Sequence, residues 1–244
     1  MILVIDVSNI SILKRSANIC TIFSLKSCHI IVSRNSKESC YPSCSVYKKV
    51  LLGKYTGISF VDSTPLRVCR NQRKHIHMTF KGIAQRGKCS MRCFIGFKLH
   101  LICNEKGELL NFMITPIDVD DQIPLEYESF MEFIYGKLVD DKGYVSKELF
   151  QKLFVDGIHL IIKLKSNMKG ALMSVSDKLL LRKRAIIETV NDEFKNIAQV
   201  EHSRHRCFDN FIVNMLRAIA AYCMFLKKPY INVQRTLDTQ LTLF

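Results

Sequence analysis

The chain has 244 residues, of which 36 are Lys or Arg and 22 are Asp or Glu, so its formal net charge is +14. Hydrophobic residues make up 48% of the sequence, which is the balance of a globular protein and not of a disordered one. The longest apolar stretch, 211–226, is interrupted by Asn214 and Arg217 and is shorter than the ~20 residues of a membrane span, so we expect no membrane association.

The ten cysteines follow no disulfide framework, and the N-terminus has no basic leader before Asp6. We therefore expect reduced thiols and a cytoplasmic location. Residues 1–50 hold ten serines and four cysteines without a persistent helical or strand period, and the composition changes near Val46. These features predict an irregular N-terminal segment over 1–47, one domain over 48–230 and a C-terminal tail over 231–244.

The domain begins with a short apolar strand over 57–61, which we expect to end in a turn at 62–65. Residues 94–104 alternate and are rich in β-formers, and a turn over 105–108 leads to a second strand over 109–115, so the pair is predicted to form a hairpin. The later expected elements are a loop over 116–121, a helix over 124–134, a strand over 137–141, a helix over 146–156, a buried strand over 158–164, one long amphipathic helix over 177–198 and a final apolar helix over 208–226.

This order of elements predicts an α/β fold, a mixed sheet with an antiparallel edge flanked by helices. Right-handed crossovers would bring the ends of strands 57–62 and 137–141 close together. In open α/β sheets, ligands and catalytic residues gather at such strand ends.

Positive charge is concentrated in the 42 residues from Ser63 to Asn104, which contain nine Lys or Arg and no acidic residue. The block is compatible with a solvated basic loop, but such a local field also suits a surface that neutralises nucleic-acid phosphates. Aromatic residues are sparse there, which favours contact with the phosphate backbone over base stacking.

Three carboxylates stand out by position. Asp62 ends the first strand, Asp141 ends a later one, and Glu188 follows two isoleucines within the long helix. Each alone has an ordinary interpretation, because an Asp can cap a turn and Glu188 can pair with Arg184 at i, i+4. Together they offer the hard oxygen ligands that Mg²⁺ prefers, and a cation would relieve their mutual repulsion.

Asp140 competes with Asp141 for the second position. Adjacent strand residues face opposite sides of a sheet, so only one of the two can point toward the other carboxylates. The neighbouring Lys-Gly-Tyr favours Asp141. We expect the other acids nearby, Asp118, Asp120 and Asp121, to lie in a solvated loop.

These residues stand in three short motifs, which are Val61-Asp62-Ser63-Thr64, Asp141-Lys142-Gly143-Tyr144 and Arg184-x3-Glu188-x6-Lys195. The acids are spaced 79 and 47 positions apart, and the motifs resemble the DDE signature of bacterial insertion-sequence transposases, in the group with a D-K-G-Y run. The same group is matched by Phe80-Lys81-Gly82, Gly96-Phe97-Lys98-Leu99-His100 and Glu201-His202-Ser203-Arg204-His205-Arg206.

The resemblance implies an RNase H-like domain in which Asp62, Asp141 and Glu188 are the catalytic residues and the ligands of two Mg²⁺ ions, with Mn²⁺ as a substitute. It implies metal-dependent cleavage of double-stranded DNA at the element ends, followed by strand transfer into target DNA. A homodimer assembled on DNA and a nucleoid-associated prokaryotic protein are also expected. The residues expected to contact DNA are Arg67, Arg70, Arg73, Lys81, Lys142, Arg184, Lys195, Arg204 and Arg206.

Arg184 and Lys195 lie near the face of Glu188 and are open to three interpretations, namely DNA-phosphate contacts, contacts that orient the acid, or a salt-bridged helix surface. The sequence departs from the family pattern at Leu181, where a tyrosine is frequent. The first 45 residues or so also do not resemble a helix-turn-helix. We therefore expect a copy that is truncated or frame-disrupted upstream of Val46.

Two other functions remain open at this stage. One is an inactive, non-catalytic DNA-binding remnant of a transposase. The other is an RNase H-type nuclease that acts on another substrate, such as an RNA–DNA hybrid.

Overall fold

The computed structural model describes residues 4–6, 29–31, 52–70, 78–88, 93–141, 146–163, 173–201 and 207–232. Its strands are β1 (Val4–Asp6), β2 (His29–Ile31), β3 (Ile58–Arg70), β4 (Gln85–Lys88), β5 (Cys93–Asn104), β6 (Leu109–Pro116), β7 (Gly136–Asp140) and β8 (Ile158–Ile162). Its helices are α2 (Ile123–Glu126), α3 (Glu128–Met131), α4 (Lys147–Val155), α5 (Val175–Lys183), α6 (Ala185–Asn196) and α7 (Phe208–Cys223).

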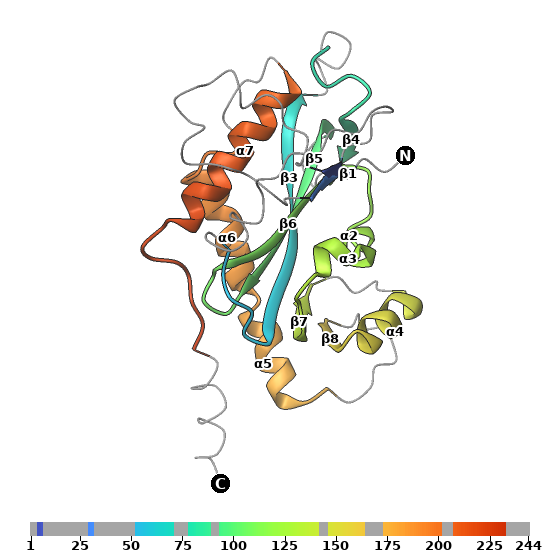
Figure 1. Ribbon diagram of the computed structural model, residues 1–244, viewed down its shortest axis with the longest axis vertical. Coiled ribbons are helices and arrows are strands. Elements are labelled where there is room, and N and C mark those ends of the chain that lie inside the picture. The colour runs from blue at the N-terminus through green and yellow to red at the C-terminus, as the bar shows by residue number, and fades with distance from the viewer. Residues whose placement is uncertain are drawn as a thin grey trace.

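The strands form one mixed sheet in the order β1-β2-β6-β5-β3-β7-β8, with β4 paired to β5. The hairpin β5–β6 and the pair β3–β5 are antiparallel, whereas β7 runs parallel to β3 and β8 runs parallel to β7. The three antiparallel strands followed by two parallel ones confirm the expected α/β, RNase H-like mixed sheet flanked by helices (Figure 1).

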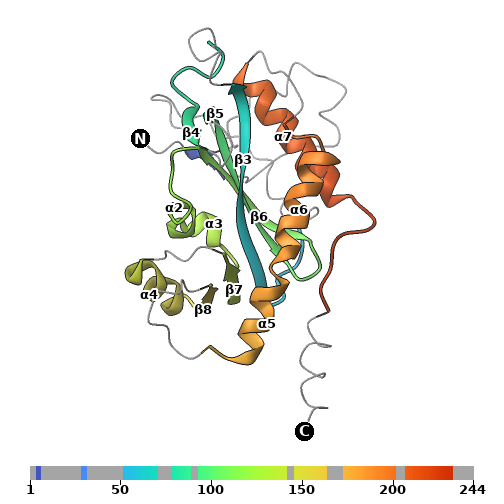
Figure 2. The same ribbon diagram turned by 180° about the vertical axis from the view of Figure 1, so that it is seen from behind.

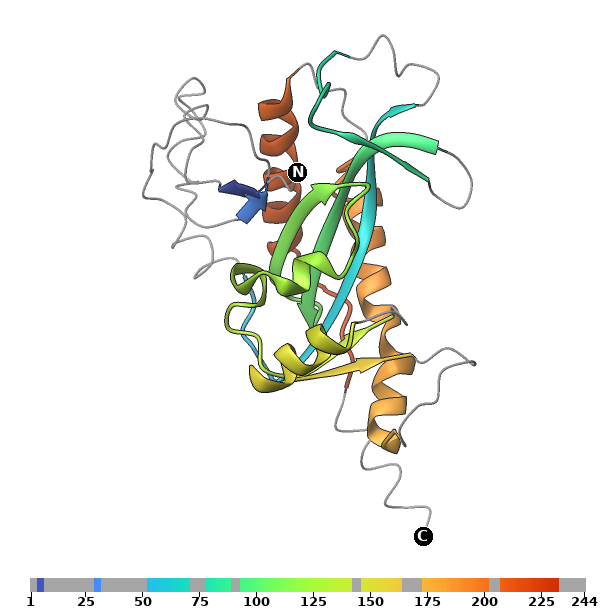
Figure 3. The same cartoon turned by 90° about the vertical axis from the view of Figure 1, so that its right-hand side faces the viewer.

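Each face of the sheet is covered by its own helices. On one face, α5, α6 and α7 pack in one cluster with Phe60, Phe97 and Val139, while α2, α3 and α4 pack on the other face with Val61 and Leu138. Seen from behind, α6 and α7 lie beside β3 and β6 (Figure 2), and in Figure 3 the orange and red helices lie on the opposite side of the sheet from the yellow-green and yellow ones. Strand β6 is buried along its whole length, and its buried residues include the polar Asn111 and Thr115 as well as apolar side chains.

Several local features follow from the sequence signals. The Ser146 side chain accepts a hydrogen bond from the Leu149 amide at 3.1 Å and so begins α4, and Gly157, with φ +78°, ends that helix and leads into β8. The described cysteines 69, 93, 103, 207 and 223 have free thiols. Within the described part of the chain, no helix combines the length and apolar character needed to cross a membrane.

Three expected elements differ from the structure. The first strand does not end near Asp62 but continues to Arg70 as β3. In β3, only Ile58 to Phe60 pair with β7. Pro65 lies beyond this pairing, so the amide hydrogen that a proline lacks is not needed for a bond to β7. The helix expected over 124–134 is split into α2 and α3, with extended backbone at Tyr127 between them.

The long helix expected over 177–198 is also divided. α5 and α6 follow directly on one another, and Arg184 alone lies between them. The Arg184 amide bonds to the Leu181 carbonyl at 3.4 Å and the Ile187 amide bonds to the Arg184 carbonyl at 3.0 Å, which are the tighter i to i+3 contacts of a 3₁₀ turn.

The strands β1 and β2 lie in the segment for which the sequence indicates no regular structure. They pair with each other, and β2 pairs with β6 through Ile30 and Ile114. The rest of 1–47 and the tail beyond Asn232 lie outside the described residues, so the proposed domain boundaries stay predictions.

One ion pair fixes α5 to β7. Lys137 Nζ lies 2.7 Å from Asp177 Oδ1, and the Asp177 side chain is 10% exposed. Burial disfavours the charged form of Asp177 and by itself would raise its pKa. The hydrogen bonds with Lys137 and Ser174 outweigh this effect, so the pKa of Asp177 is lowered. The charged carboxylate therefore holds the start of α5 against the strand that leads to Asp141.

We predict that Asp177→Asn lowers the free energy of unfolding by about 1 kcal/mol at neutral pH, because a charge-assisted hydrogen bond is lost. Because the pKa of Asp177 is lower in the folded protein than in the unfolded chain, its carboxylate stabilises the fold above pH ~4, the usual aspartate range. This stabilisation is lost as the pH falls through the folded-state pKa. Urea unfolding between pH 7 and pH 3 should show the two proteins converging at low pH. The control is Asp192→Asn, at an exposed position of α6; a constant difference across pH would contradict the prediction.

Candidate active site

The register of two parallel strands brings Asp62 and Asp141 to the same level of the sheet. Phe60 on β3 pairs with Val139 on β7, and each aspartate lies two residues beyond this pair. Because side chains alternate, Asp62 shares the face of Phe60 and Asp141 continues the face of Val139, which is the face covered by α6. Asp140 continues the face of Leu138 and is buried at 5% exposure.

Helix α6 brings a polar stripe to this point. Its apolar side chains Ile187, Val190 and Phe194 are fully buried in the same cluster as Phe60 and Val139. Residues 184, 188, 191 and 195 follow each other at spacings of four, three and four, so they form a neighbouring stripe along the helix. The buried face thus sets the direction in which Glu188 points.

Arg184 connects two of the three predicted acids. Its Nη2 atom lies 2.6 Å from Glu188 Oε1 and 3.2 Å from Asp141 Oδ2. The Arg184 side chain is 17% exposed, while Asp141 and Glu188 are 46% and 53% exposed. This geometry fits two of the three interpretations of the sequence, a contact that orients the acids and a salt-bridged helix surface.

Asn191 connects α6 to the third acid. Its Nδ2 donates a hydrogen bond to Asp62 Oδ2 at 2.9 Å, although the two residues are far apart in sequence. Sequence reasoning did not select Asn191. Its spacing of three from Glu188, and its position between the apolar Val190 and Phe194, are the signals that could have found it.

The three carboxylates do not form a ready-made ligand cluster, since no group of three or more His, Cys, Asp or Glu side chains within the described residues is arranged to hold a metal ion. In this arrangement the Arg184 guanidinium contacts both Asp141 and Glu188. The donor chemistry nevertheless fits Mg²⁺, because all three side chains are hard oxygen ligands on adjacent elements. A further oxygen, Asn191 Oδ1, lies beside Asp62 and is buried with no hydrogen-bond partner in the part of the chain that the structure describes.

A second network fastens the opposite face of β3. The Ser63 hydroxyl donates to Asp121 Oδ1 at 2.8 Å, and Lys98 Nζ lies 3.3 Å from the same oxygen. Lys98 also donates to the Val119 carbonyl at 2.7 Å, so the loop after β6 is held directly behind Asp62. The expectation of a solvated loop therefore holds for the exposed Asp118 and Asp120 and is wrong for Asp121.

The residues expected to contact DNA are only partly described. Arg67 and Lys81 are exposed and Lys195 is partly exposed. The Arg67 amide donates to Glu201 Oε1 at 3.2 Å, which joins the far part of β3 to the segment after α6. Arg67 lies five residues beyond Asp62, or ~16 Å along an extended strand. The side chain of Arg70 and the whole of Arg73, Lys142, Arg204 and Arg206 lie outside the described residues.

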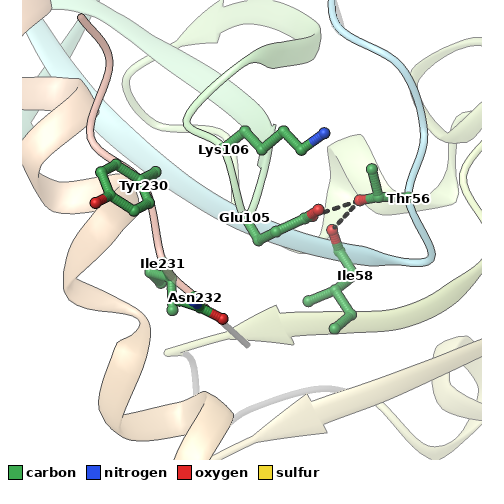
Figure 4. Close-up of a pocket in the computed structure, with 7 residues that line it drawn as sticks. All are labelled: Thr56, Ile58, Glu105, Lys106, Tyr230, Ile231 and Asn232. Atoms are coloured by element: carbon green, nitrogen blue, oxygen red, sulfur yellow. Dashed lines mark hydrogen bonds between the residues drawn. The ribbon is translucent and has the colours of Figure 1, made fainter. Parts of the chain in front are cut away.

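A pocket of about 370 Å³ lies at the start of β3, beside Thr56 and Ile58, and none of the three predicted acids lines it. Figure 4 shows it between Thr56, Glu105 and Tyr230, with a hydrogen bond from the Thr56 hydroxyl to Glu105. None of its lining residues belongs to the predicted site.

A comparison with protein families decides the classification. The family described as "Transposase DDE domain" matches residues 52–208, which is more than half of the chain. The chain belongs to this family. The resemblance to DDE transposases is thereby confirmed, and the chain carries a transposase DDE domain. Bacterial origin, an insertion-sequence context and a disrupted N-terminus stay predictions.

No curated protein matches the chain. Among solved structures, it is similar to one described as a piggyBac transposase synaptic complex with hairpin DNA, with a TM-score of 0.47 and 10% sequence identity. The match covers 78% of this chain and 52% of that chain, so this protein spans about half the length of that transposase.

We predict that Arg184→Gln lowers the free energy of unfolding by about 1 kcal/mol at low salt, because Asp141 and Glu188 lose the guanidinium group that contacts both. The loss should shrink at high salt, since ions screen the repulsion between these partly exposed groups. Urea unfolding at 50 and 500 mM NaCl measures both effects. The matched control is Arg182→Gln, at an exposed position of α5. A loss no greater than that of the control would show that the bridge is not a stabilising contact.

Proposed function

We propose that the chain is a DNA transposase that cleaves DNA strands and joins the freed 3′ end of an insertion sequence to target DNA. The observation that carries the proposal is that the register of β3 and β7 brings Asp62, on β3, and Asp141, just after β7, to the same level of the sheet. Asn191 of α6 bonds to Asp62, and Arg184, immediately before α6, pairs with Asp141. Membership of the DDE transposase domain family supports the same reaction class.

In this proposal Asp62, Asp141 and Glu188 hold two Mg²⁺ ions, and Mn²⁺ substitutes for them. When bound, such a pair activates the attacking oxygen, first of a water and then of the 3′-OH, and stabilises the leaving oxygen. The protein supplies carboxylates, positioning and positive charge, and needs no covalent intermediate with DNA.

The remaining residues act on the acids and on DNA. Arg184 keeps Asp141 and Glu188 oriented while no metal ion is present. Once a metal ion binds the acids, the Arg184 side chain is released and can turn toward a DNA phosphate. The exposed Arg67 and Lys81, together with the net charge of +14, suit neutralisation of the phosphate backbone of double-stranded DNA. We further propose assembly as a homodimer on DNA, because two element ends must be processed together, and a nucleoid-associated location in a prokaryotic cytoplasm.

We predict metal-dependent cleavage and strand transfer on labelled DNA that carries the ends of the element, with Mg²⁺ active and EDTA inactive. Asp62→Ala, Asp141→Ala and Glu188→Ala should each reduce the rate by about 10³-fold or more, because ligands that act as one unit are not replaced by the others. The exposed Asp192→Ala, on the same helix as Glu188, should retain activity.

The same assay separates the competing functions. Folded protein that binds DNA without cutting it would make the chain a non-catalytic remnant. Cleavage of an RNA–DNA hybrid without joined DNA products would make it an RNase H-type nuclease. Either result would contradict the transposase proposal.

A further inference from the structure

Asn191 is a buried polar residue at the contact between α6 and β3. The residue is 6% exposed, and it lies one helical turn beyond Glu188. Its neighbours on the buried side of the helix, Val190 and Phe194, are fully buried apolar side chains. An amide in such surroundings is unfavourable unless its donor and acceptor groups are satisfied.

Only one end of the amide is satisfied. Nδ2 donates to Asp62 Oδ2 at 2.9 Å, which fixes one oxygen of the aspartate from the side of the helix. Oδ1 is buried and has no hydrogen-bond partner among the described residues. An unpaired buried carbonyl oxygen costs about 1–3 kcal/mol, which is a large cost for a contact that only joins a helix to a strand.

The unpaired oxygen has the chemistry of a cation ligand. Amide carbonyl oxygens coordinate hard divalent cations and also accept hydrogen bonds from cation-bound water. In the same side chain, the amide nitrogen holds a carboxylate that is itself a predicted ligand. Groups that orient a ligand in this way contribute to metal affinity even without touching the metal.

We propose that Asn191 is a fourth residue of the cation site, which positions Asp62 through Nδ2 and supplies Oδ1 to the divalent cation or to its bound water. The inference rests on the proposed function, since it requires that Asp62 binds a metal. It goes beyond the three acids, because it assigns the buried amide of α6 to the site and gives a reason for an asparagine at that position.

The test is Mn²⁺ binding to the full chain without DNA, followed by the electron paramagnetic resonance signal of free Mn²⁺. Asn191→Leu keeps the size of the side chain and removes both polar groups, and should weaken Mn²⁺ binding by about 10- to 100-fold. Asp62→Ala should weaken it at least as much. The exposed Asp192→Asn, adjacent on α6, should bind Mn²⁺ like the wild type.

Asn191→Asp provides a second variant that separates a cation ligand from a structural contact. It keeps an oxygen at the site but places a second carboxylate beside Asp62, so the metal-free protein should unfold at a lower temperature than the wild type. Saturating Mn²⁺ should remove most of this difference, and Mn²⁺ affinity should be equal to or higher than that of the wild type. A purely structural asparagine would give the same loss with and without Mn²⁺.

These measurements test the assignment of Asn191 separately from the proposed function. If the wild type binds Mn²⁺ and Asp62→Ala abolishes binding, but Asn191→Leu binds normally, the assignment of Asn191 is overturned and the proposed function stands. If Asp62→Ala also binds normally, or the wild type binds no Mn²⁺, both are overturned.

Discussion

The packing of α6 against the sheet, over β3 and β5, is the constraint on which the site depends. One buried cluster contains Ile187, Val190 and Phe194 of α6 together with Phe60 and Val139 of the sheet. Burial of each such side chain stabilises the fold by about 1.5–3 kcal/mol. Because this apolar face is fixed against the sheet, the adjacent stripe of α6 must lie over the strand positions that follow Phe60 and Val139. Those positions are Asp62 and Asp141, so hydrophobic burial places the polar groups of the helix against the acids of the sheet.

Electrostatic interactions determine how the three acids are held when no metal ion is bound. Carboxylates on neighbouring elements repel each other, and Arg184 offsets the repulsion by contacting both Asp141 and Glu188. Asp62 is held separately, by the amide of Asn191. The site is therefore organised in two halves, one balanced by an arginine and one held by an asparagine. A divalent cation would have to displace the guanidinium from at least one carboxylate before the halves could act together.

Sequence patterns anticipated the parts of this site that depend on local chemistry. The β-forming residues of β5 and β6, the Ser146 cap and each short acidic motif carry their information within a few residues, and the fold followed from the order of the elements. Contacts between distant residues were not accessible in this way. The continuation of β3 through Pro65 depends on where its pairing with β7 ends. The roles of Asn191 and Asp121 depend on partners at Asp62 and Lys98 that no local pattern reveals.

The central claim is that Asp62, Asp141 and Glu188 form one cation site beneath α6. The most direct measurement is anomalous diffraction from crystals of the protein grown with Mn²⁺. We predict anomalous density in contact with Asp62 and at least one of the other two acids, with the Arg184 side chain withdrawn from one of its carboxylates. Crystals that contain Mn²⁺ elsewhere, while Arg184 still bridges Asp141 and Glu188, would contradict the claim.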